Sequence, residues 1–303
     1  MTDSVIETSD LRKTYSDGGK ALRGLTLQVP AGSIFGFLGK NGAGKTTTIK
    51  VLLGMTNPTS GDARVFGLPA FDRDASVAIR RRMGFVSEDK DLYDSMTVQE
   101  ITRFTAGFYP KWRRDLEARY IDAFELPGRR KVKALSRGMR TKLALLLAFC
   151  RGADLLVLDE PMSGLDPAVN EDVLQALVRH VADEGATVFF SSHQLADIDQ
   201  IADHVAVIDR GRAIVSGSLD DIRDRYRRIQ MVFENDAPSI SFRTPDVIRT
   251  RRDGRMLTVF ASGGAKAIAD EARALNAVSV DITPLTLKEI FLESVNASVH
   301  AEN

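Results

Sequence analysis

Hydrophobic and polar residues follow different patterns in different parts of the chain, and the first pattern is that of short strands. Apolar residues alternate with polar ones over the opening segments, which glycine and proline turns separate. A helical pattern follows at residues 46–55, directly after a Gly-rich turn. The first part is therefore β-rich and leads into an α/β core. The strands expected in it are residues 5–8, 21–29, 33–38 and 62–67.

From Thr97 onward the apolar residues recur at helical spacing. Thr97 and Glu100 are spaced as a capping box, which marks the start of a helix. Two continuous apolar runs come later, "LLVLDE" at 155–160 and "TVFFSSH" at 187–193. Such runs are typical of parallel strands buried on both faces. We therefore expect an α/β core with a helical subdomain at about residues 88–150.

The pattern changes again near residue 220 and predicts a small α+β domain. An Asp-Gly pair between two apolar runs is a strong hairpin signal there. We expect one domain at residues 1–225 and a C-terminal accessory domain at 226–303. The elements expected in the last part are a helix at 220–229, a strand at 229–234, a hairpin at 247–260, a helix at 267–276, a strand at 278–282 and a helix at 286–295.

The charges and the hydropathy of the chain limit its partners. Its 303 residues include 41 Lys and Arg against 41 Asp and Glu, so the formal net charge is zero. A general nucleic-acid binder needs a basic face that displaces counterions, so no specific nucleic-acid partner is expected. No apolar run approaches the roughly 20 residues that a membrane-spanning helix needs. A role at a membrane would therefore come through a partner chain.

The strongest chemical signal is the stretch "GKNGAGKTT", residues 39–47, which satisfies G-x-x-x-x-G-K-[ST] between an expected strand and an expected helix. Glycines let the backbone wrap around phosphate oxygens, Lys45 neutralises the β and γ phosphates, and the Thr46 hydroxyl can ligate Mg²⁺. The motif predicts binding of a nucleotide with Mg²⁺. The residues expected to hold the phosphates are Gly39, Asn41, Gly42, Gly44, Lys45, Thr46 and Thr47.

Two carboxylates, Asp159 and Glu160, end the first apolar run, where an α/β sheet presents its ligands. Asp159 suits the Mg²⁺ side of a phosphoryl-transfer site, and Glu160 could polarise an attacking water. Alone, such a pair could equally cap a helix. By themselves, Tyr15 and His193 would more often be packing residues.

A second anion-binding pattern lies in "KALSRGMRTKLA", residues 133–144, where a Ser-Arg-Gly turn precedes an apolar run at helical spacing. A helix that begins in this way directs its amide groups and the positive end of its dipole at an anion. Because the phosphate loop already provides one cradle, the chain has two such sites.

The order of these motifs resembles that of the ATP-binding cassette (ABC) transporter ATPase family, from residue 5 to about residue 218. The resemblance implies a P-loop NTPase core with an N-terminal antiparallel β subdomain, a helical subdomain and a small C-terminal α+β domain. By similarity, Tyr15 stacks on adenine, Glu160 is the catalytic carboxylate, His193 holds the γ-phosphate and the attacking water, and Asp166 belongs to the nucleotide site. The matching motifs are Tyr15, "GKNGAGKTT", "SRGM", "LLVLDEP", "SGLD" and His193.

In this family two cassettes pair head to tail, which gives the second cradle a purpose. Ser136 and the Gly138 amide would serve the ATP that is bound to the partner, and a homodimer is the simplest arrangement. The sequence departs from the family pattern at Arg137 and Met139, which replace a glycine and a glutamine. Glu88 stands where a glutamine normally senses Mg²⁺ and the γ-phosphate, and it could still ligate Mg²⁺.

The ending "ITPLTLKEIFLESV" resembles that of ATPase subunits from ABC-2-type drug and multidrug exporters. We therefore expect an ATPase on the cytoplasmic face of the cell membrane, attached to an integral membrane permease on a separate chain. The alternative is a soluble cassette ATPase acting on ribosomes or DNA. Those relatives generally carry two cassettes or a long coiled coil, whereas this chain has one phosphate loop and no sustained heptads. The Ser-Arg-Gly turn at residues 136–138 and His193 argue against a GTPase or kinase.

Overall fold

The computed structural model describes residues 4–300. The contacts within it divide the chain into two compact units that meet between Ser216 and Gly217. This division falls before the expected boundary at 225/226, because helix α8 (Leu219–Arg225) groups with the second unit. No helix in the described part of the chain has both the length and the apolar character needed to span a membrane.

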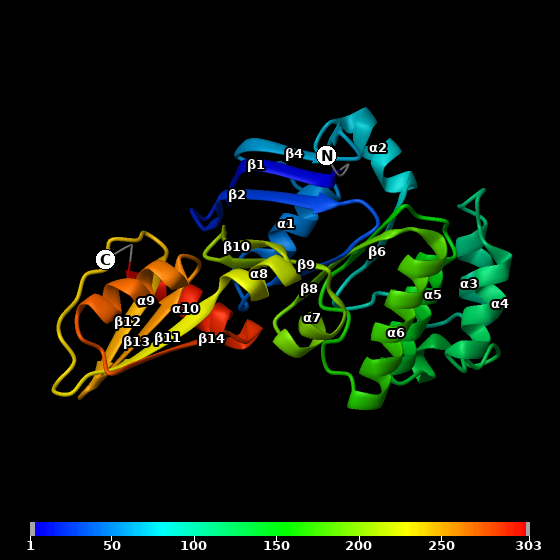
Figure 1. Ribbon diagram of the computed structural model, residues 1–303. Helices are drawn as coiled ribbons and strands as arrows, with labels where there is room; N and C mark the ends of the chain where they lie inside the picture. The colour runs from blue at the N-terminus through cyan, green and yellow to red at the C-terminus, as the bar shows by residue number, and fades with distance from the viewer. Residues whose placement is uncertain (1–3, 301–303) are drawn as a thin grey trace. The chain divides into compact units, whose positions relative to one another are not determined.

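The first unit begins with an antiparallel sheet in the order β2-β1-β4-β5 (Figure 1). Strand β1 runs further than the expected 5–8, and its register shifts near Asp10, a non-glycine residue with φ 45°. The side chains of Ile6, Leu25 and Val65 are buried on the face that joins the core. The strands are β1 (Ser4–Thr14), β2 (Lys20–Pro30), β4 (Ser60–Val65) and β5 (Leu68–Pro69).

A six-stranded sheet in the order β10-β9-β3-β8-β7-β6 forms the centre of this unit. The parallel neighbours in it are β6, β7, β8, β3 and β9. Every residue of β7 and β8 is buried, which confirms the expectation from the two continuous apolar runs, and every residue of β3 is buried as well. The carboxyl ends of these three strands lead into the phosphate loop, Glu160 and His193. The strands are β3 (Ile34–Leu38), β6 (Met83–Val86), β7 (Leu155–Leu158), β8 (Thr187–Ser192), β9 (His204–Asp209) and β10 (Arg212–Ser218).

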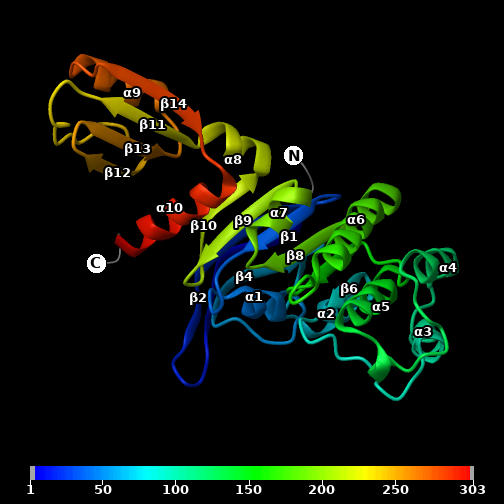
Figure 2. The same ribbon diagram turned by 90° about the horizontal axis from the view of Figure 1, so that it is seen from below.

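The helices of the first unit follow the expected order, and the capping box of Thr97 and Glu100 at the start of α3 is confirmed. Both views show α3 and α4 beyond α5, on the β6 side of the sheet (Figures 1 and 2). Helix α2 and strand β6 were not expected individually. The helices are α1 (Lys45–Leu52), α2 (Arg73–Arg81), α3 (Val98–Ala106), α4 (Arg114–Ala123), η1 (Val132–Ala134), α5 (Arg137–Phe149), α6 (Pro167–Glu184) and α7 (Leu195–Ile201).

The second unit is an antiparallel sheet in the order β12-β13-β11-β14, with α9 (Ala265–Ala274) across β11 and β14 (Figure 2). Gly254 has φ 54° in the expected Asp-Gly hairpin turn. The helix expected at 220–229 ends at Arg225, because Ile229 pairs in the sheet and enters the core of this unit. The remaining elements are β11 (Arg227–Val232), β12 (Val247–Asp253), β13 (Met256–Ala261), β14 (Ser279–Pro284) and α10 (Leu287–His300).

Candidate active site

The phosphate loop joins β3 to α1 and is held in shape by its own backbone. Gly44 has φ 114°, and a Cβ there would lie 2.7 Å from the Ala21 carbonyl oxygen, so only glycine fits. The side chain of Lys45, the first residue of α1, is folded back over the loop: its Nζ donates to the carbonyl oxygens of Gly39 at 2.7 Å and Lys40 at 3.3 Å. The loop therefore presents a compact set of amides around one lysine.

A cavity of about 640 Å³ opens beside this loop. Most of the residues expected around the triphosphate line it, and Ala21 and Ser163 join them without having been expected. Gly39, Tyr15, Asp159, Ser136, Gly138 and Asp166 are not part of its lining. The lining residues are Ala21, Asn41, Gly42, Gly44, Lys45, Thr46, Thr47, Glu88, Glu160, Ser163 and His193.

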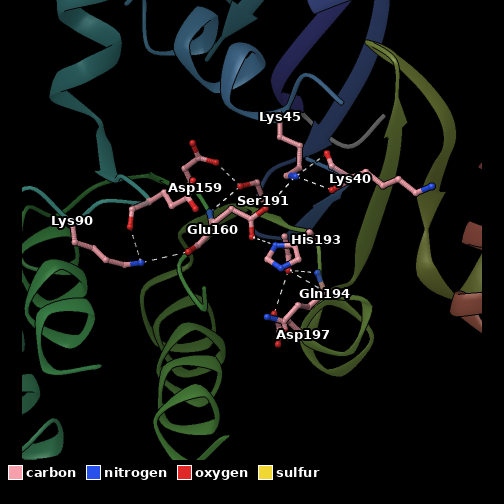
Figure 3. A network of polar contacts seen from close by, with 12 residues as sticks. Lys40, Lys45, Lys90, Asp159, Glu160, Ser191, His193, Gln194 and Asp197 are labelled. Atoms are coloured by element: carbon pink, nitrogen blue, oxygen red, sulfur yellow. Dashed lines mark hydrogen bonds and ion pairs between the residues drawn. The ribbon is translucent and has the colours of Figure 1, made fainter. Parts of the chain in front are cut away.

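Glu160 lies at the centre of a network of polar contacts that includes two other residues of the cavity lining, Lys45 and His193 (Figure 3). The residue is 5% exposed. Its Oε2 lies 2.8 Å from His193 Nδ1, and its Oε1 lies 3.1 Å from Lys45 Nζ as an ion pair. Among the described residues, Oε1 receives no well-aligned hydrogen bond. A buried carboxylate oxygen with unused acceptor capacity beside a cavity is suited to accept a proton from a water.

Ser191, at the end of β8, fixes both carboxylate residues, and the sequence analysis did not identify it. Its Oγ donates to Asp159 Oδ1 at 2.6 Å and accepts from the Glu160 amide at 2.9 Å. Asp159 is buried behind the cavity surface rather than on it. The available signal was the Ser-Ser pair immediately before His193, at the end of an apolar strand.

The acidic residues fit Mg²⁺ that arrives with a nucleotide rather than Mg²⁺ alone. Within residues 4–300, no three His, Cys, Asp or Glu side chains are placed to hold a metal by themselves. Mg²⁺ usually keeps several waters and uses one or two carboxylates together with substrate phosphates. Thr46 and Glu88 border the cavity, and Asp159 lies behind it. One hydroxyl and two carboxylates are a ligand set that suits Mg²⁺ bound together with nucleotide phosphates.

Tyr15 lies next to the phosphate loop although it does not line the cavity. Its hydroxyl is 3.2 Å from the Thr47 Oγ1, and its side chain is 39% exposed. The Lys13 Nζ lies 5.2 Å from the ring centre. The ring is therefore accessible to a flat ligand at the edge of the cavity, while its stacking on adenine stays a prediction.

The second cradle begins at Ser136, whose Oγ accepts from the Met139 amide at 3.2 Å and caps α5. Gly138 faces its own chain, because a Cβ there would lie 2.8 Å from Val169 Cγ1. A side chain at Gly138 would therefore project into its own chain, whereas the Gly138 amide lies in the open first turn of α5. Asp166 accepts from the Val169 amide at 3.0 Å and caps α6.

Arg137, which replaces a glycine of the family pattern, packs against the turn that follows Glu160. Gly164 in this turn has φ 68°, and a Cβ there would collide with the Arg137 guanidinium. Arg137 also borders a second cavity of about 340 Å³, together with Glu88, Asp89, Lys90 and Arg140. Arg137, the first residue of α5, thus connects the second cradle to the turn after Glu160 in the same chain.

Comparison with known proteins agrees with this geometry. The family described as ABC transporter matches residues 22–163. The bacitracin transport ATP-binding protein BcrA of Bacillus licheniformis is 31% identical over 298 residues, which cover 96% of this chain and 95% of the relative. The daunorubicin/doxorubicin resistance ATP-binding protein DrrA of Streptomyces peucetius is 39% identical over 224 residues, which cover 72% of this chain and 66% of the relative.

Solved structures show the same fold. The ATP-binding subunit of an ABC transporter superposes with a TM-score of 0.65 at 30% identity, covering 73% of this chain and 92% of that one. The dimeric bacterial ABC transporter cassette MJ0796 has a TM-score of 0.64 at 22% identity, covering 71% of this chain and 98% of that one. The cavity, the phosphate loop and the relatives together place the chain in one family: it belongs to the ATP-binding proteins of ABC transporters.

Proposed function

We propose that this chain hydrolyses ATP to ADP and phosphate and that the reaction powers an exporter whose membrane-spanning permease is a separate chain. The observation that carries the proposal is the position of the Glu160 carboxylate, between Lys45 Nζ and His193 Nδ1 at the edge of the cavity. A carboxylate beside a phosphate loop can activate a water for attack on phosphorus.

The chemistry assigns one task to each residue. The loop amides and Lys45 bind the phosphates, and a water oxygen attacks the γ-phosphorus while the bond to the β–γ bridging oxygen breaks. Glu160 accepts the proton of that water, and His193 holds the γ-phosphate and the water while its Nδ1 contacts the Glu160 carboxylate. When bound between Thr46, Glu88, Asp159 and the phosphates, Mg²⁺ would neutralise negative charge on the phosphate oxygens.

Pairing of two copies is supported by the separation of the two cradles. Ser136 and Gly138 do not line the cavity that Lys45 borders, so the amides at the start of α5 are available to a nucleotide held by another chain. In a head-to-tail homodimer each ATP would lie between the phosphate loop of one copy and the Ser136 turn of the other.

The relatives support a proposal for the direction of transport and for the location. BcrA is named for bacitracin transport and DrrA for resistance to daunorubicin and doxorubicin. By likeness to them we assign the chain to drug export, on the cytoplasmic face of the membrane with its permease. The same relatives favour this function over the alternative of a soluble ATPase acting on ribosomes or DNA.

Phosphate release from Mg-ATP by the purified protein tests the reaction. Wild type should turn over, Lys45→Ala should lose ATP binding, and Glu160→Gln should bind ATP without hydrolysing it. Affinity capture of the chain from detergent-solubilised membranes tests the partner, and a polytopic membrane protein should co-purify. A Glu160→Gln protein that hydrolyses at the wild-type rate would remove Glu160 from its role as base.

A further inference from the structure

Lys90 is a buried lysine without a carboxylate partner in the described part of the chain. It follows β6 in the polar segment "SEDK", has φ 48°, and is 4% exposed. Its Nζ donates to two backbone carbonyl oxygens, that of Glu88 at 3.0 Å and that of Glu160 at 3.4 Å (Figure 3). Burial lowers the pKa of the Lys90 ammonium, and the nearby Arg137 guanidinium lowers it further. Burying an ammonium in this way costs free energy, and we therefore expect the buried Lys90 to have a function.

The backbone of Glu160 needs such support. Glu160 has φ 47°, a conformation that costs a non-glycine residue free energy and persists only when its surroundings hold it. Ser191 Oγ holds the amide side of the residue at 2.9 Å. On the carbonyl side, the Ser163 amide donates at 3.2 Å and Lys90 Nζ at 3.4 Å. Lys90 thus supplies one of the two donors that fix the peptide following Glu160.

The loop that carries Lys90 also reaches the cavity. Glu88, two residues earlier, lines the cavity, and its carbonyl oxygen accepts from Lys90. One ammonium therefore connects the loop after β6 to the segment after β7. A displacement of this loop would therefore move the backbone of Glu160 and, with it, the Glu160 carboxylate.

We propose that Lys90 is a positioning residue for Glu160, which holds the backbone of Glu160 in its left-handed conformation and so aims the carboxylate at the attacking water. The inference rests on the proposed role of Glu160 as the base. Lys90 itself does not line the cavity. Its removal should slow the chemical step and leave nucleotide binding almost unchanged, because the phosphate loop is a separate segment.

The test compares Lys90→Met, which keeps the length and loses the donor, with Lys90→Gln, which keeps an N–H donor without the charge. Lys142→Met is the matched control, because Lys142 is also buried but pairs with Asp172 at 2.7 Å, away from Glu160. Steady-state kinetics give kcat and KM for ATP, and thermal unfolding gives stability. Hydrogen exchange of a peptide covering 159–164 reports how firmly the backbone after β7 is held.

We expect Lys90→Met to lower kcat at least about tenfold with KM changed less than about threefold, the pattern of an interaction needed in the transition state. Lys90→Gln should recover part of kcat, and exchange in 159–164 should be faster in Lys90→Met than in Lys142→Met. Wild-type kcat and unchanged exchange in Lys90→Met would overturn the inference, and so would equal losses of kcat and stability in Lys90→Met and Lys142→Met. Failure of the proposed function would give a different result, because the wild type would then be as inactive as Glu160→Gln.

Discussion

Lys45 Nζ and Glu160 Oε1 lie 3.1 Å apart, and both side chains are almost completely buried. The lysine expected to bind phosphates is therefore paired with the carboxylate expected to activate water. Phosphate oxygens would compete with Glu160 for this lysine, because one ammonium has only three N–H donors and two of its directions already point to the carbonyl oxygens of Gly39 and Lys40. The ion pair therefore opposes nucleotide binding, and a bound nucleotide would release the Glu160 carboxylate from Lys45.

This competition predicts a tighter nucleotide complex in Glu160→Gln. The substitution removes the ion pair and one negative charge near the phosphates, so ATP affinity should rise by at least about threefold. His193→Ala removes the other partner of Glu160 and a residue of the cavity lining but keeps the Lys45 pair, so it should not raise the ATP affinity. Equilibrium titration with a fluorescent ATP analogue at low protein concentration measures the effect. Equal affinities in wild type and Glu160→Gln would show that the ion pair does not oppose binding.

Ser136 offers a charge test of the second cradle that does not disturb the fold. Asp and Asn both cap helices about as well as Ser, so either replacement should keep the cap of α5. Ser136→Asp adds a negative charge where the partner's phosphates are expected and should lower kcat at least about tenfold, since like charges repel strongly at short range. Ser136→Asn should retain most of the activity. Indistinguishable rates would place the start of α5 away from any nucleotide.

Glu88 should make hydrolysis more sensitive to Mg²⁺ than a glutamine would. Its carboxylate borders the cavity near Lys45 and Thr46, so beside a γ-phosphate it needs a cation to offset the repulsion. We expect Glu88→Gln to keep the maximal rate within a few-fold and to lower the Mg²⁺ concentration for half-maximal rate. The measurement is ATPase rate against free Mg²⁺ at saturating ATP. Superimposable curves would show that Glu88 is an ordinary loop carboxylate.

His180, which lies outside the site, should make folding stability depend on pH. It stacks on Phe149 with ring centres 4.2 Å apart, and burial lowers its pKa from 6.5 to about 4. Between these pH values the unfolded chain binds a proton that the native chain excludes, so stability falls as the pH falls, by about 3 kcal/mol over the whole window. His180→Phe keeps the stack and should remove this dependence. Urea unfolding across the window compares the two slopes, and parallel slopes would contradict the assignment.

The convergence of the site could be predicted because it follows from chain direction. The phosphate loop, Glu160 and His193 each follow a fully buried run, and the carboxyl ends of parallel strands meet at one edge of a sheet. Apolar runs bounded by turn residues were sufficient to place those strands. The ion pair of Lys45 with Glu160 could not be predicted, because it depends on side-chain directions across two segments.

Other features depend on tertiary packing that no local pattern reveals. Lys90 lies in a segment of charged residues that resembles an exposed loop, yet it is buried, and its Nζ reaches the carbonyl oxygen of Glu160 after β7. Residues 227–229 continue the helical pattern of α8, yet Ile229 is drawn into a strand by its pairing with Val259 and Ile282. In both places contacts distant in sequence override local propensity.

The pairing of two copies around each ATP is tested most directly by the mass of Glu160→Gln in solution. Size-exclusion chromatography with light scattering should give a monomer without nucleotide and a dimer with Mg-ATP, because the slowed reaction traps the paired state. Adding Ser136→Asp to Glu160→Gln should abolish the dimer while ATP still binds. A Glu160→Gln protein that is saturated with ATP and remains monomeric would contradict the shared site.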